Sequence, residues 1–117
     1  MNDDGMAPEE RLLRAVFGTE LAEAGLAAAF AAPTESVARQ LEDRIRAGLE
    51  SLSYRERGVI EMRFGLGDGC VYTLAQAGYV FDLTRERIRQ IQTRGLRRLR
   101  ARLQGLRNYV NELGGNE

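Results

Sequence analysis

Four polar residues in the C-terminal half of the chain have side chains that can hydrogen bond to the edges of DNA bases. They fall within six consecutive positions, and a helix turns by about 100° per residue, so one side of a helix would present all four. An arginine can pair with O6 and N7 of guanine, a glutamate accepts from N4 of cytosine, and a glutamine can pair with adenine. The spacing predicts a recognition helix in the major groove, with a solvated face held by intrahelical pairs as the alternative. The four residues are Arg85, Glu86, Arg89 and Gln90.

The segment that precedes these residues predicts how they are positioned. Thr73 begins a capping-box pattern, so we expect a short helix over residues 74–80. A turn over residues 81–83 then leads to Thr84, which can cap a long helix that begins at Arg85. A short helix, a tight turn and a second helix are the spacing of a helix-turn-helix. The apolar side chains that could fill the wedge between the two helices are Leu74, Phe81, Leu83, Ile88 and Ile91.

Charge is distributed unevenly along the chain. The 17 basic residues balance 17 acidic ones, and every basic residue is arginine. Residues 1–50 carry five arginines and ten acids, whereas residues 83–107 carry nine arginines against Glu86 alone. Like charges at that density repel one another unless a polyanion or an acidic partner offsets them. The clustering favours contact with nucleic acid, whereas codon bias also explains the absence of lysine.

Length and composition exclude several classes of protein. A chain of 117 residues suits one small domain, or one domain with an extension, rather than a multidomain enzyme. The absence of histidine and the single cysteine, Cys70, exclude a zinc finger, a histidine-based hydrolase and a disulfide scaffold. We therefore expect no enzyme, no cofactor and no metal site. The longest uncharged stretch, residues 69–81, is too short to span a bilayer, and the acidic first ten residues are unlike a secretory signal.

Helical patterns also cover the rest of the chain, and no strand pattern stands out. We expect one helix over residues 8–17, a second over 19–32 with Thr19 as its cap, and a third from about residue 34 to about residue 52. A capping box that begins at Ser53 starts a further helix. The predicted fold class is all-α: a small helical domain with a C-terminal helix-turn-helix and an N-terminal helical extension.

Apolar residues recur at three-four spacing near the C-terminus and predict a seam for another helix. We prefer intramolecular packing of this seam on the acidic N-terminal extension, and a homodimer is the alternative. The seam consists of Leu96, Leu99, Leu103, Leu106, Val110 and Leu113.

Residues 52–100 resemble region 4 of the sigma-70 family of RNA polymerase sigma factors. The resemblance is carried by the runs LSYRER at 52–57, MRFGL at 62–66, TL at 73–74, TRERIRQI at 84–91 and LRRLR at 96–100. It implies a helical domain that reads the −35 promoter element and docks on the flap of the polymerase β subunit. It also implies a bacterial protein in the cytoplasm, associated with the nucleoid.

The resemblance assigns roles to individual residues. Arg85, Glu86, Arg89 and Gln90 would face the bases. Contacts to phosphates would come from Arg55, Arg63, Leu74 through its backbone, and Thr84. Contacts to an activator or to the DNA backbone would come from Arg94, Arg97, Arg98 and Arg100. The directions of these last four around a helix are scattered, so they cannot all touch one face of DNA.

The resemblance also divides the chain into a region 4-like domain over residues 52–117 and an extension of unassigned role over residues 1–51. Residues 8–18 are similar to a short stretch of bacterial RNA polymerase β near its flap, a similarity that a generic amphipathic helix also explains. The extension is either a helical cover for the small domain or a module that binds a partner or a second copy.

Two departures from the family pattern bear on function. Gly58 and Gly95 stand where good helix formers are expected, each at a cost of about 1 kcal/mol if exposed. Nothing resembles sigma region 2, which grips the core enzyme and melts the −10 element, so we expect a separate regulator or a fragment that does not open a promoter alone.

The function that we predict is a sequence-specific, DNA-binding transcription factor that reads a −35-like element and contacts RNA polymerase. The alternative is an interaction module that mimics sigma region 4, binding the β flap or another transcription factor without specific DNA reading. An enzyme is the least favoured class, because no acid-base pair or nucleophile is apparent.

Overall fold

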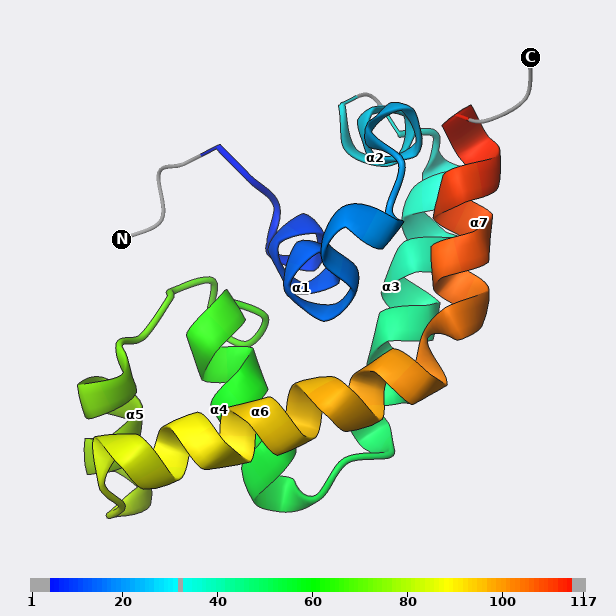
Figure 1. Ribbon diagram of the computed structural model, residues 1–117. Coiled ribbons are helices and arrows are strands. Elements are labelled where there is room, and N and C mark those ends of the chain that lie inside the picture. The colour runs from blue at the N-terminus through cyan, green and yellow to red at the C-terminus, as the bar shows by residue number, and fades with distance from the viewer. Residues whose placement is uncertain (1–4, 32, 115–117) are drawn as a thin grey trace.

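The computed structural model describes residues 5–31 and 33–114. Over these ranges the chain forms α-helices and one short 3₁₀ turn, with no strand, so the all-α prediction is confirmed (Figure 1). The elements are α1 (Pro8–Phe17), the 3₁₀ turn η1 (Gly18–Glu20), α2 (Glu23–Phe30), α3 (Glu35–Glu50), α4 (Tyr54–Phe64), α5 (Leu74–Phe81), α6 (Arg85–Arg102) and α7 (Gln104–Gly114). No helix within the described ranges is both long enough and apolar enough to cross a bilayer.

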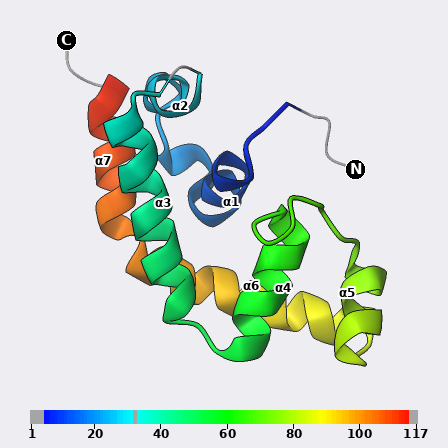
Figure 2. The same ribbon diagram turned by 180° about the vertical axis from the view of Figure 1, so that it is seen from behind.

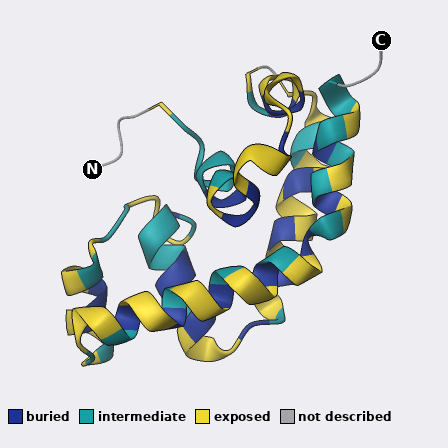
Figure 3. Ribbon diagram, in the orientation of Figure 1, coloured by how far each residue is buried: buried dark blue, intermediate teal, exposed yellow. Residues whose placement is uncertain are grey.

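Helix α6 is the axis on which the other helices are arranged. Helices α4 and α5 pack on its N-terminal half, and α1, α3 and α7 gather towards its C-terminal end (Figures 1 and 2). Figure 3 shows the buried residues where the helices meet, whereas the outer faces are exposed. A small apolar cluster of Val59, Ala77, Ile88 and Ile91 joins α4, α5 and α6. A larger cluster joins α1, α2, α3 and α7 to the C-terminal half of α6.

Side-chain caps define the starts of the helices around the helix-turn-helix. The Ser53 and Thr73 hydroxyls accept from the backbone N–H groups of Glu56 and Gln76, and those two side chains accept in return from the cap N–H groups. The Thr84 hydroxyl accepts from the N–H of Arg87. Capping residues satisfy N–H groups that a helix start leaves without a partner, so the predicted starts of α4, α5 and α6 are confirmed.

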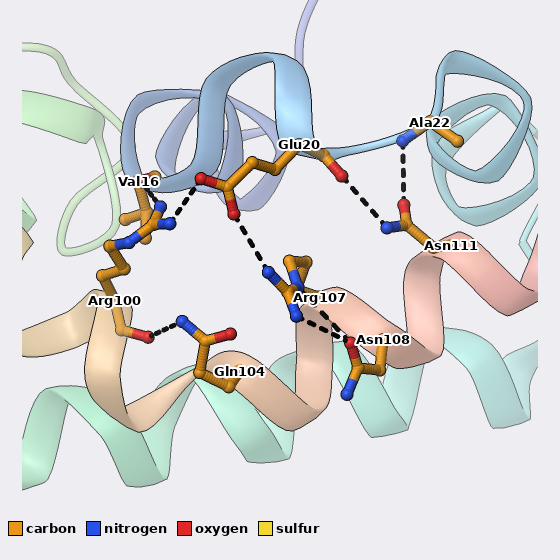
Figure 4. Close-up of polar contacts among 8 residues, drawn as sticks. All are labelled: Val16, Glu20, Ala22, Arg100, Gln104, Arg107, Asn108 and Asn111. Carbon is orange, nitrogen blue, oxygen red and sulfur yellow. Dashed lines mark hydrogen bonds and ion pairs between the residues drawn. The ribbon is translucent and has the colours of Figure 1, made fainter.

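The predicted cap at Thr19 is wrong. Residues 18–20 form the turn η1, and α2 begins at Glu23 with no side-chain cap. Asn111 of α7 explains the difference, because its Oδ1 accepts from the Ala22 N–H at 2.8 Å and its Nδ2 donates to the Glu20 carbonyl at 3.0 Å (Figure 4). The Ala22 N–H group therefore has its acceptor on a side chain 89 residues away, a contact that no local sequence pattern predicts.

The long C-terminal helix is interrupted at Leu103, a feature that the continuous apolar spacing did not predict. Helix α6 ends at Arg102 and α7 starts at Gln104 in a new direction. The Gln104 side chain donates to the Arg100 carbonyl at 3.1 Å, one of the groups that the end of a helix leaves without a backbone donor. The elbow lets α7 turn along α3 and α2.

The N-terminal extension packs into the body of the protein. The apolar face of α1, with Leu12, Leu13, Val16 and Phe17, is buried in the same cluster as the C-terminal seam. Helix α2 lies so close to α7 that a Cβ atom on Gly25 would come within 2.2 Å of the Val110 carbonyl oxygen. The predicted intramolecular packing of the seam is confirmed, and the division of the chain after residue 51 stays a prediction.

Gly58 and Gly95 stand at close approaches between helices. A Cβ atom on Gly95 would come within 2.7 Å of Ile60 Cδ1, and one on Gly58 would come within 2.7 Å of Phe81 Cζ. The expected cost of an exposed glycine in a helix does not describe Gly95, which is buried. The glycine at this position lets α4 cross close to α6.

An acidic clasp joins the extension to the elbow. The Glu20 carboxylate accepts from Arg100 of α6 and from Arg107 of α7, the second at 3.0 Å (Figure 4). The guanidinium of Arg100 also lies over the ring of Phe17, 5.5 Å from its centre. Hydrogen bonds from the two arginines, the one from Arg100 foremost, lower the pKa of Glu20.

Replacement of Gly95 by alanine should destabilise the fold by about 1–3 kcal/mol, because the added methyl group meets Ile60 in a packed crossing. Helix propensity alone predicts the opposite sign. Urea unfolding measures the difference, with Gly105→Ala as the control, since a Cβ atom there meets only Arg44 Nη1 at 3.6 Å. Unchanged or raised stability of Gly95→Ala would contradict the close crossing.

Replacement of Glu20 by glutamine should lower Tm at pH 7 and make less difference in acid. A carboxylate whose pKa is lowered by folding stabilises the fold above its ordinary pKa of about 4.3, and this contribution is lost as pH falls through the folded pKa. Thermal unfolding from pH 7 to pH 3 measures the gap between wild type and E20Q. Glu42→Gln, on the exposed side of α3, is the control. A gap that stays constant with pH would exclude an ionic role for the clasp.

Candidate nucleic-acid interface

The first two turns of α6 present their polar side chains to solvent. Ile88 and Ile91 are 0% and 2% exposed and anchor the helix against α4 and α5. The four residues predicted to face the bases are exposed, whereas Arg87 and Gln92 are half-buried, so the predicted segregation of the polar and apolar faces is what the structure contains. The exposed residues are Arg85, Glu86, Arg89 and Gln90.

Intrahelical pairs organise this polar face. The Glu86 carboxylate accepts from Arg89 Nε at 3.0 Å and Nη2 at 2.6 Å, and from Gln90 Nε2 at 3.3 Å. The hydrogen bond from Arg89 lowers the pKa of Glu86, and the same contact raises the pKa of Arg89. Exposed pairs of this kind contribute little to stability, so these groups can exchange their partners for DNA at small cost. The intrahelical pairs that were the predicted alternative to a recognition helix are therefore present, and the polar face that carries them is still accessible.

A groove runs between the N-termini of α5 and α6. The start of each helix leaves backbone N–H groups without an intrahelical acceptor and carries the positive end of a helix dipole. Three guanidinium groups, from Arg63, Arg85 and Arg89, lie around it. Such a groove suits phosphate groups. Its lining residues are Arg63, Thr73, Leu74, Ala75, Arg85, Glu86 and Arg89.

Arg63 is held in place by contacts that sequence reasoning did not anticipate. Its Nε donates to Gln92 Oε1 of α6 at 2.8 Å, and its Nη1 donates to the Tyr72 carbonyl at 2.7 Å. The Tyr72 N–H donates in turn to the Met62 carbonyl at 2.9 Å. These bonds tie α4, the loop before α5 and α6 together beside the groove. The only sign in the sequence that Gln92 could face another helix is its position next to Ile91, which is buried.

The remaining arginines assigned by family resemblance lie outside the groove. Arg55, Arg94 and Arg97 are exposed, with no hydrogen-bond or ion-pair partner among the described residues. Arg98 pairs with Glu56 at 3.1 Å, and that carboxylate is only 3% exposed. Arg100 is held by the Glu20 clasp. Of the residues assigned to bases and phosphates, the groove thus brings together Arg63, Leu74, Arg85, Glu86 and Arg89. Gln90, Thr84 and Arg55 do not line it, and Arg98 and Arg100 have intramolecular partners.

Comparisons with known proteins match the part of the chain that contains the groove. The family model for sigma-70, region 4 matches residues 48–101, the range that contains α4, α5 and nearly all of α6. An RNA polymerase sigma-C factor from Nostoc sp. is 38% identical over 115 residues, which cover 97% of this chain and 22% of the relative. RNA polymerase sigma factor SigA from Nostoc sp. and SigA1 from Synechococcus elongatus are each 46% identical over 69 residues, or 58% of this chain, and 18% and 17% of the relatives. The chain therefore spans about a fifth of the length of these relatives.

Replacement of Gln92 by leucine should release Arg63, because the Nε–H group loses its acceptor. We expect the Arg63 Nε–H signal in NMR spectra to exchange with solvent slowly in the wild type and quickly in Q92L. The Arg89 Nε–H signal is the internal control, since its acceptor Glu86 is unaffected. If Arg63 exchanges at the same rate in both proteins, Gln92 does not hold it.

Proposed function

Because residues 48–101 form a sigma-70 region 4 domain, we propose that the chain binds promoter DNA in a sequence-dependent way and regulates transcription together with RNA polymerase. The observation that carries this proposal is the groove where Arg63, Arg85 and Arg89 meet two helix N-termini. A duplex offers both the phosphates that such a groove attracts and the base edges that the adjacent side chains can read.

The proposed docking places the start of α6 in the major groove. Arg85 and Arg89 can each pair with guanine, Glu86 can accept from cytosine, and Gln90 can pair with adenine. Phosphates on the flanking strand would bind Arg63, the backbone N–H of Leu74 at the start of α5, and Thr84 at the cap of α6. The element read in this way is proposed to be −35-like.

The polymerase contact in this proposal is the β flap, and the setting is the bacterial cytoplasm at the nucleoid. A region 4 domain acts by binding, so the proposal includes no enzymatic activity. Sequence-specific DNA binding brings the chain to a promoter, and the polymerase contact makes its presence affect initiation.

A second candidate function is polymerase binding without specific DNA reading. Three large apolar side chains support it, because Tyr54, Tyr79 and Val80 are 85%, 90% and 60% exposed. The ring of Phe81 meets Tyr54 edge-on with centroids 6.3 Å apart, and none of the three exposed side chains lines the groove. Large apolar side chains exposed on a folded domain mark surfaces that can contact another protein.

Selection of duplexes from a random pool, with and without polymerase core, tests both functions. We expect the chain alone to enrich a defined site, and Arg85→Ala or Arg89→Ala to weaken binding to that site by about 1–3 kcal/mol. Arg63→Ala should weaken all duplexes alike and lower the salt slope by about 1, since it contacts phosphate. Arg39→Ala, which removes an equal charge on α3, is the control.

Enrichment that requires polymerase core, with no effect of Arg85→Ala, would support the second candidate. Duplex affinity that depends on neither sequence nor Arg85 would contradict the first.

A further inference from the structure

The extension lies on the side of α6 that faces the proposed duplex. Arg100 follows Arg89 by eleven residues, about three helical turns, so the two side chains leave α6 within about 20° of each other and about 16 Å apart along it. In both views α1 lies on the side of α6 where α4 ends, which is the side that carries Arg63 (Figures 1 and 2). The stripe of α6 that begins at the groove therefore continues beneath the extension.

Arg100 stands where it could meet the DNA backbone rather than the bases. The major groove is about 12 Å wide, so a guanidinium about 16 Å beyond Arg89 falls near a phosphate strand that borders the groove. Arg107, one helix further on, shares a carboxylate partner with Arg100 and lies close to it. Both arginines would extend the phosphate contacts of the groove if they were free.

The extension holds both arginines through one carboxylate. Glu20 accepts from Arg100 and from Arg107, and Arg100 also donates to the Val16 carbonyl at 3.4 Å (Figure 4). Asn111 fixes the backbone on both sides of the linker, through the Glu20 carbonyl and the Ala22 N–H. The Glu20 and Arg100 side chains are 38% and 41% exposed, so water and other anions reach this contact.

We infer that Glu20 occupies in cis the position of a DNA phosphate, so that the extension withholds Arg100 and Arg107 from the duplex. This inference rests on the proposed DNA binding. A carboxylate and a phosphate make the same kind of charge-assisted hydrogen bond to a guanidinium, so one can replace the other. Unlike the Glu86–Arg89 pair, Glu20 binds two arginines at once and its backbone carbonyl is held by Asn111, so a phosphate must displace two ion pairs to free Arg100 and Arg107. The extension thereby limits the number of phosphates that the chain neutralises.

The test compares two matched variants on a short duplex of random sequence. Glu20→Gln removes the charge that holds Arg100 and Arg107. Glu23→Gln removes an equal charge from the same extension, but its partner is Arg14 of α1 at 3.0 Å rather than an arginine of α6 or α7. We expect E20Q to bind about three- to tenfold more tightly and to steepen the salt slope by about 1–2, one unit for each phosphate gained. E23Q should keep the wild-type slope.

Arg100→Ala provides a second test that does not depend on releasing the clasp. It should weaken duplex binding less in the wild type than in E20Q, because Glu20 already occupies Arg100 in the wild type, and it should remove most of the gain in E20Q. Equal salt slopes for E20Q and E23Q, or an equal loss on Arg100→Ala in both backgrounds, would overturn the inference. Failure of the proposed function is a separate result, since it is read from the sequence preference of Arg85→Ala.

Discussion

The crossing of α4 over α6 determines where the groups of the candidate interface lie. Gly95 is at its centre, where the absence of a side chain lets Ile60 approach. On one side of the crossing Glu56 binds Arg98, and on the other Arg63 binds Gln92. These contacts fix the direction of α6 relative to α4, and the apolar wedge around Ile88 then sets α5 against both. The groove with its three arginines follows from this packing.

The parts of the fold that depend on local chemistry could be predicted from the sequence. The starts of α4, α5 and α6 could be predicted because each has a capping residue whose effect extends over three or four positions, namely Ser53, Thr73 and Thr84. The alternation of polar and apolar residues along α6 likewise assigned one face to the wedge and the other to solvent. Base-facing roles for Arg85 and Arg89 stay predictions, because exposure alone does not report contact with DNA.

The parts that depend on contacts between distant residues could not be predicted. Arg107 and Asn111 reach η1 and the linker that follows it from 87 to 91 positions along the chain, and they decide where α2 begins. Gln92 acquires its role only because α4 brings Arg63 beside it. The elbow at Leu103 breaks a continuous apolar pattern, so the pattern itself conceals it. The extension contributes α1 to the larger apolar cluster and is therefore part of the folded core. It also borders the proposed DNA surface.

The proposed interface requires a duplex to meet the protein at the starts of α5 and α6. NMR titration of the full chain with a duplex tests this most directly, because each backbone amide reports its own surroundings. We expect shifts concentrated at residues 73–75 and 84–90 and at Arg63, with the outer face of α3 unaffected. Shifts centred on α2 and α3, with the start of α6 silent, would contradict it.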